Sequence, residues 1–148
     1  MRSAARVGML AVTAAIGVVL GGCTVTGSTS HGLPHASNGT NLQACASGNC
    51  EVQVGTSAQI PLPETAFVQG LQVQAISSNS VTVTGRSVGL LHSGPCSGNC
   101  SASSSVRGVF QLTLGSQGVG VENNLQVQML GTDGKSAVLL ISPRVRRG

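Results

Sequence analysis

Apolar and polar residues alternate along most of the chain beyond residue 45. This period of two is the pattern of β-strands that bury one face and expose the other. Clusters of Gly, Pro, Asn, Asp and Ser separate the alternating stretches, and no long window shows the period of an amphipathic helix. The strands that this pattern predicts are 51–54, 59–62, 71–76, 81–84, 88–91, 109–114, 125–130 and 136–141, of which 88–91 has the weakest pattern.

Short strands at this spacing predict an all-β domain, a small antiparallel β-sandwich or barrel. The pair Asp133-Gly134 between the last two strands is a typical hairpin turn. Pro61 and Pro63 place the second strand at a sheet edge or at a strand end, because proline has no N–H to donate to a ladder.

Val, Leu and Ile supply most of the expected core, with Phe67 and Phe110 as its two large fillers. Two stretches lack a strand pattern. Residues 93–105 form a Gly-, Ser-, Pro-, Cys- and Asn-rich insert, and the glycines of 115–120 predict a loop.

The N-terminal 22 residues have the layout of a secretory signal. Two arginines precede an uncharged, mostly aliphatic run, which is short for a transmembrane helix of about 20 apolar residues. The run ends in Leu20-Gly21-Gly22-Cys23, which resembles the lipobox of bacterial lipoproteins. In a lipobox, small residues beside the cleavage site allow the peptidase to bind, and the lipid is attached to the sulfur of the cysteine. We therefore expect cleavage before Cys23 and lipidation of this residue.

A lipidated Cys23 would hold the chain on the extracytoplasmic face of the cell membrane. Each buried methylene of an acyl chain such as palmitate contributes about 0.8 kcal/mol, so three chains anchor firmly where one is marginal. The residues that follow, up to Asn41, have almost nothing to bury and predict a flexible tether. The expected organisation is a signal peptide at 1–22, a lipidated cysteine and linker at 23–44, a β domain at 45–142 and a basic tail at 143–148.

Four cysteines remain in the predicted domain: Cys45, Cys50, Cys96 and Cys100. An even number in an exported chain predicts two disulfides, for which three pairings are possible. Chain entropy favours long bridges, at about 4 kcal/mol against about 2 kcal/mol for a short loop. Proximity in the sequence during export favours Cys45–Cys50 and Cys96–Cys100, and we expect this local pairing.

His92, Cys96 and Cys100 form the alternative, an extracytoplasmic copper or zinc site. They are spaced by three residues and would offer one imidazole and two thiolates, a donor set that suits Cu(I) or Zn(II). In an oxidising compartment the two thiols are expected to bond to each other instead. The disulfide is therefore the first expectation, with no cofactor.

The sequence Cys-Ala-Ser-Gly-Asn-Cys-Glu-Val at 45–52 begins a further resemblance. Together with the later alternating strands and the final hairpin at 133–139, it is similar to a family of small secreted proteins and lipoproteins of actinobacteria that begin with Cys-x-Ser-Gly-x-Cys-Glu-Val. The likeness covers roughly 45–142, and the second cysteine pair is unusual for it. The resemblance implies export and a β domain, and it implies no activity.

The side chains needed for catalysis or ring stacking are scarce. His92 is the one histidine of the predicted domain, its carboxylates are scattered, and no nucleophile–base spacing occurs, so we expect no enzyme. Nucleic-acid and sugar binding use aromatic side chains that stack on rings. The chain has no Trp or Tyr, and its two Phe are expected inside, so neither partner is predicted.

The remaining class is an interaction module of the cell envelope. Charged residues make up 8% of the chain, against about 25% in ordinary soluble domains, and the predicted outer faces carry mainly Gln and Thr. Charges at sheet edges normally deter pairing with other strands, so their scarcity leaves an edge open to a partner strand. We predict a lipid-anchored β domain that binds another envelope component, a protein rather than a polymer.

Overall fold

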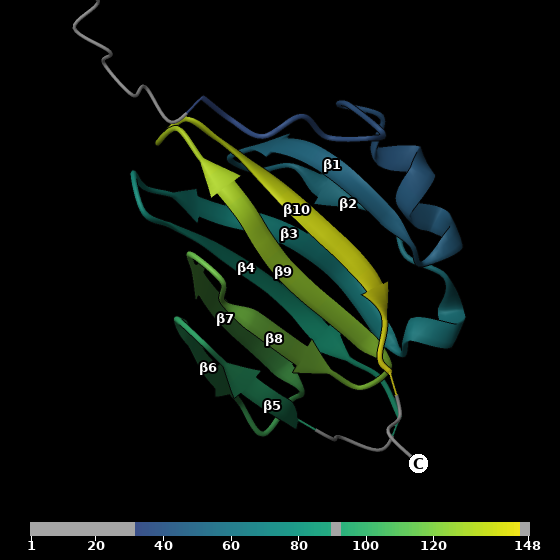
Figure 1. The fold of residues 1–148 in the computed structure, drawn as a ribbon. Coiled ribbons are helices and arrows are strands. Elements are labelled where there is room, and N and C mark those ends of the chain that lie inside the picture. The colour runs from purple at the N-terminus through teal and green to yellow at the C-terminus, as the bar shows by residue number, and fades with distance from the viewer. Residues whose placement is uncertain (1–31, 90–92, 146–148) are drawn as a thin grey trace, which may run out of the picture.

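Two antiparallel sheets, packed face to face, make up the part of the chain that the computed structural model describes, residues 32–89 and 93–145 (Figure 1). The first sheet has the order β1 (Cys50–Gly55), β10 (Ser136–Pro143), β9 (Leu125–Thr132), β8 (Val119–Glu122) and β5 (Ser93–Ser97). The second has the order β2 (Gln59–Ile60), β3 (Val68–Ile76), β4 (Ser80–Ser87), β7 (Val109–Gly115) and β6 (Cys100–Ser104). Two short 3-10 helices, η1 (Leu42–Ser47) and η2 (Glu64–Ala66), complete the fold. The predicted all-β class is confirmed, as a sandwich.

The alternation of apolar and polar residues decides which face of each strand is buried. In β7, Phe110, Leu112 and Leu114 point into the core, while Val109 and Gln111 are exposed. The same alternation holds along β1, β4 and β9. Apolar side chains from the two sheets meet in one core, as a sandwich requires.

The predicted Asp-Gly hairpin turn and the predicted edge position of the second strand are both confirmed. Gly134 has a φ of +88° in the turn between β9 and β10, and the Asp133 carboxylate accepts the N–H groups of Ser136 (2.7 Å) and Lys135 (2.8 Å). These two hydrogen bonds lower the pKa of Asp133. The strand before Pro61 is the two-residue β2, and it is the outermost strand of its sheet.

Three strands lie where the sequence predicts none. β5 and β6 occupy the insert at 93–105, and β8 crosses the stretch expected to be a loop. β5 and β6 lack the usual pattern because they are built from Ser, Gly, Pro, Cys and Ala, and β8 and β7 supply their pairing partners. β8 is the four-residue stretch Val-Gly-Val-Glu and pairs with β9 as well as with β5. In β8, a Cβ on Gly120 would lie 2.8 Å from Leu112, so glycine lets this strand approach the core closely. In the strand expected at 88–91, residues 88 and 89 are not in a strand, and the other two residues lie outside the described part.

Phe67 is not a core filler, which corrects the prediction, whereas Phe110 is one (1% exposed). Phe67 ends η2 with a φ of +52°, and Val68 takes the inward position at the start of β3. The side chain of Phe67 is 49% exposed. Its carbonyl accepts hydrogen bonds from the Asn123 side chain (2.7 Å) and the Val88 N–H (2.9 Å), which hold this turn in place.

The folded part begins before the boundary expected at Cys45. Ala36 is buried, and Pro34 lies so close to Gly131 in β9 that a side chain at that glycine would collide with it. Val138 of β10, which pairs with Gly131, is fully buried as well. The C-terminal part of the expected linker therefore packs on the first sheet. Its few apolar atoms are enough for this packing because β9 and β10 provide the surface that they cover.

Candidate functional site

Two of the predicted site residues, Cys23 and His92, lie outside the described residues. The other four, Cys45, Cys50, Cys96 and Cys100, are bonded in the expected local pairs. The prediction of two local disulfides is confirmed by these pairs.

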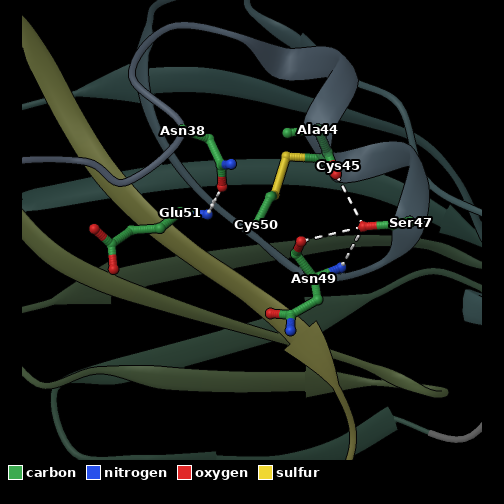
Figure 2. The surroundings of a disulfide bond; sticks show 7 residues. All are labelled: Asn38, Ala44, Cys45, Ser47, Asn49, Cys50 and Glu51. Atoms are coloured by element: carbon green, nitrogen blue, oxygen red, sulfur yellow. Dashed lines mark hydrogen bonds between the residues drawn. A yellow bond between two sulfur atoms is a disulfide. The ribbon is translucent and has the colours of Figure 1, made fainter.

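The Cys45–Cys50 bridge ties η1 to the first residue of β1 (Figure 2). Both cysteines are buried, at 0% and 4% exposure. Ser47 donates its hydroxyl to the Ala44 carbonyl (3.0 Å), and Gly48 has a φ of +83°, which favours glycine over other residues. The Cys-x-Ser-Gly-x-Cys motif is thus a compact turn that starts the first strand, and its residues are explained by folding.

The Cys96–Cys100 bridge has a different place, because it joins β5 of the first sheet to β6 of the second. Both of its cysteines are partly buried. The alternative copper or zinc site required these two sulfurs as thiolates, and here they are bonded to each other. Within the described part of the chain, no three His, Cys, Asp or Glu side chains gather in a metal-binding arrangement.

A buried polar pair that the sequence does not reveal lies between the two sheets. The carboxylate of Glu122 in β8 accepts a hydrogen bond of 2.7 Å from the hydroxyl of Ser87 in β4, and both residues are buried. A buried carboxylate needs such a donor to offset its lost hydration. The pair links the sheets and explains why these polar residues occur at inward positions.

The remaining candidate is the set of sheet edges, where an unpaired strand can bind another chain. The outer strands are β1 and β5 in the first sheet and β2 and β6 in the second. Figure 1 shows β5 and β6 on the side of the sandwich away from β1 and β2.

The edge of β1 is covered by the segment that precedes η1. The N–H of Glu51 donates to the Asn38 side chain and its carbonyl accepts the Asn38 N–H, each at 2.9 Å (the side-chain bond is drawn in Figure 2). The N–H of Gln53 donates to the Gly39 carbonyl at 2.8 Å. Three outward backbone groups in the first half of β1 are therefore already paired, and the covering segment blocks this part of the edge.

Two further edges are poor templates for a partner strand. β2 has two residues and ends at Pro61. β5 contains Pro95, which has no N–H, and its pairing with β8 is interrupted between Ser93 and Cys96. Short length, proline and bulges are the ordinary means by which proteins close sheet edges.

The edge of β6 has no such cover among the described residues. The Gly115 N–H donates to the Asn99 carbonyl (2.7 Å), and the Ser105 N–H donates to the Val109 carbonyl (2.8 Å). These two bonds show which residue pairs between β6 and β7 are hydrogen-bonded. Hydrogen-bonded and non-bonded pairs alternate in antiparallel strands, so the backbone N–H and C=O groups of Ser101 and Ser103 point towards β7. The N–H and C=O groups of Ala102 and Ser104 therefore point outward.

β6 also lacks the side chains that normally protect an edge. Its sequence, Cys-Ser-Ala-Ser-Ser, has no charge, no proline and no bulky residue, and its last four residues are exposed. Its ladder with β7 runs through five consecutive pairs without a bulge. The strand is therefore regular enough to pair on its free side.

Comparisons with known proteins find no matching family model, no similar curated protein and no similar solved structure. In the described residues, no helix has the length and apolar character needed to cross a membrane.

Proposed function

We propose that this protein is a lipid-anchored module of the cell envelope. It binds a partner protein by pairing its own edge strand β6 with a strand of the partner. The observation that carries the proposal is the edge of β6, which is regular, uncharged and uncovered, whereas the described structure closes β1, β2 and β5. Strand addition supplies affinity through main-chain hydrogen bonds, so it needs no charged or aromatic side chains on the module.

The proposed location on the extracytoplasmic face rests on two independent features. The lipobox-like sequence ends at Cys23, whose lipid would anchor the chain. The two disulfides are of the kind that persists in oxidising compartments outside the cytosol. The resemblance to small exported actinobacterial proteins agrees with both.

Binding of a partner at β6 is tested by photocrosslinking in intact cells. A photoreactive residue replaces Ser101, whose side chain is exposed on β6. A second variant combines the photoreactive residue at position 101 with Ala102→Pro. Because the Ala102 N–H points away from β7, proline removes an outward donor and leaves the ladder with β7 intact. We expect a crosslinked partner from the first chain and loss of that product from the second.

The matched control is Phe67→Ala, which removes the large exposed aromatic side chain beside β3 and leaves β6 unchanged. It should retain the crosslinked partner. A strictly monomeric protein without any crosslinked product at Ser101 contradicts the proposed function. Retention of the product in Ala102→Pro contradicts pairing at the edge.

The anchor is tested by the intact mass of the protein from its native membrane, alkylated before reduction. We expect a chain that starts at a lipidated Cys23 and has four unalkylated cysteines. In Cys23→Ser the protein should leave the membrane fraction. An unlipidated N-terminus in the native protein contradicts the anchor.

A further inference from the structure

A half-open pocket of about 330 Å³ lies where four segments of the chain meet. These segments are the end of η1, the η2 segment, the start of β9 and the end of β10. None of the lining residues belongs to β6. The pocket is therefore a site separate from the edge on which the proposed function rests.

Hydrogen bonds hold three of these segments together. The Asn124 N–H donates to the Ala66 carbonyl (3.3 Å), and the Asn124 side-chain amide donates to the Thr65 carbonyl (3.1 Å). The Arg144 N–H donates in turn to the Asn124 carbonyl (2.7 Å). All these residues line the pocket, so its shape is fixed by the fold and needs no ligand to form.

The floor of the pocket is apolar. Its buried lining residues are Gly48, Ala66 and Leu125. Gly48 lies close to Pro63, because a Cβ on this glycine would be 3.1 Å from the Pro63 Cγ, and the turn of the first disulfide thus closes one wall. The volume is at the lower end of the range for ligand sites, roughly 300–1,000 Å³, so the floor suits one short aliphatic group.

The rim of the pocket carries a positive charge. Arg144 is exposed and is the one charged residue of the lining. Glu64 is also exposed, but it lines the neighbouring groove beside Phe67 and not this pocket. Within the described part of the chain no carboxylate forms an ion pair with Arg144. A guanidinium group binds a carboxylate through two parallel hydrogen bonds, so this rim is suited to an anion.

From this charge and this floor we infer that the pocket binds a carboxylate that carries one short aliphatic group. The carboxylate pairs with Arg144, and the aliphatic group leaves water on the floor formed by Ala66 and Leu125. The same chemistry occurs at the C-terminus of a peptide that ends in an aliphatic residue and in a free aliphatic acid. An amine would meet the positive charge of Arg144 without any acid in the lining to offset it.

The test is a titration of the isotope-labelled full chain, purified in detergent, followed by NMR of its backbone amides. The probe is N-acetyl-leucine. Its amide removes the charge, and N-acetylglycine removes the aliphatic group. We expect the probe to shift the Gly48, Ala66 and Asn124 amides saturably and to bind at least about tenfold more tightly than either control.

A short peptide with the same C-terminal residue identifies the source of the ligand. Tighter binding of the peptide than of N-acetyl-leucine indicates a peptide C-terminus, and equal binding indicates a free acid. Both results support the site.

Two arginine variants test the role of the rim. Arg144→Gln should weaken binding of the probe at least about tenfold. The matched control, Arg107→Gln, removes the same charge from the exposed turn between β6 and β7 and should change the affinity by less than about twofold. A chain that ends at Val145 lacks Arg146 and Arg147 and should also stay within about twofold.

Three results overturn the inference: equal binding of N-acetyl-leucine and its amide, similar losses in the two arginine variants, or loss of binding on removal of residues 146–148. The last result would place the carboxylate on the tail. Thermal unfolding of each variant establishes that the fold is retained. None of these results bears on the crosslinked product at Ser101, so this inference and the proposed function fail independently.

Discussion

The two disulfides close loops of nearly equal length in different surroundings, so replacing them one at a time measures what burial adds to stability. Their sequence separations are 5 and 4 residues. In the chain-entropy model, loops of this size each contribute about 2 kcal/mol to the free energy of unfolding. Cys45 and Cys50 belong to the core, whereas Cys96 and Cys100 are partly buried at the sheet edge.

Replacing the buried pair by Cys45→Ala and Cys50→Ala also removes two sulfur atoms from the core. Deleting one buried heavy atom of this size costs about 1 kcal/mol, through lost transfer energy and the remaining cavity. We therefore expect a loss of about 4 kcal/mol for this pair, against about 2 kcal/mol for Cys96→Ala with Cys100→Ala.

Guanidinium unfolding followed by far-ultraviolet circular dichroism is the suitable assay, because the chain has no Trp or Tyr for fluorescence. A second measurement on the unsubstituted protein is mild reduction with alkylation, which should label Cys96 and Cys100 before the buried pair. Equal losses in the two double variants, or a larger loss at Cys96–Cys100, would refute the reasoning from burial.

Three further predictions concern packing, the covered edge and the last hairpin. A Cβ at Gly85 would lie 2.7 Å from the Phe110 ring, so Gly85→Ala should cost about 1–3 kcal/mol in chemical unfolding. In a Phe110→Leu background the cost should fall, and an unchanged cost would contradict the clash. Asn38→Ala should cost about 1 kcal/mol and speed hydrogen exchange at the Glu51 amide, which loses its acceptor; unchanged exchange would count against the covered edge. The lowered pKa of Asp133 means that its carboxylate stabilises the fold above the ordinary value of 3.8, and that this stability is lost as the pH falls through the lowered value. The difference in Tm between the unsubstituted protein and Asp133→Ala should therefore shrink on acidification below 3.8, and a constant difference would be evidence against the turn.

Local chemistry explains why much of the fold is predictable. Burial of one strand face requires alternating residues, so the strands around Val52, Val83, Leu112 and Val127 can be recognised from the sequence. The final hairpin depends on the Asp-Gly turn, and the disulfides close between cysteines a few residues apart. Each of these features needs only neighbours in the chain.

The features that only the tertiary structure decides depend on contacts between distant segments. β5 and β6 have weak strand preferences, and the short β8 contains a glycine, so these three strands depend on pairing with other strands. Phe67 is exposed because the turn before β3 gives Val68 the inward place. The segment before η1 becomes ordered by the edge of β1 that it covers. The sequence by itself therefore determined a disulfide-bonded β domain with few edge charges. Which edge stays open was decided by packing, because one chain segment pairs with the outer edge of β1 and no described segment pairs with the outer edge of β6.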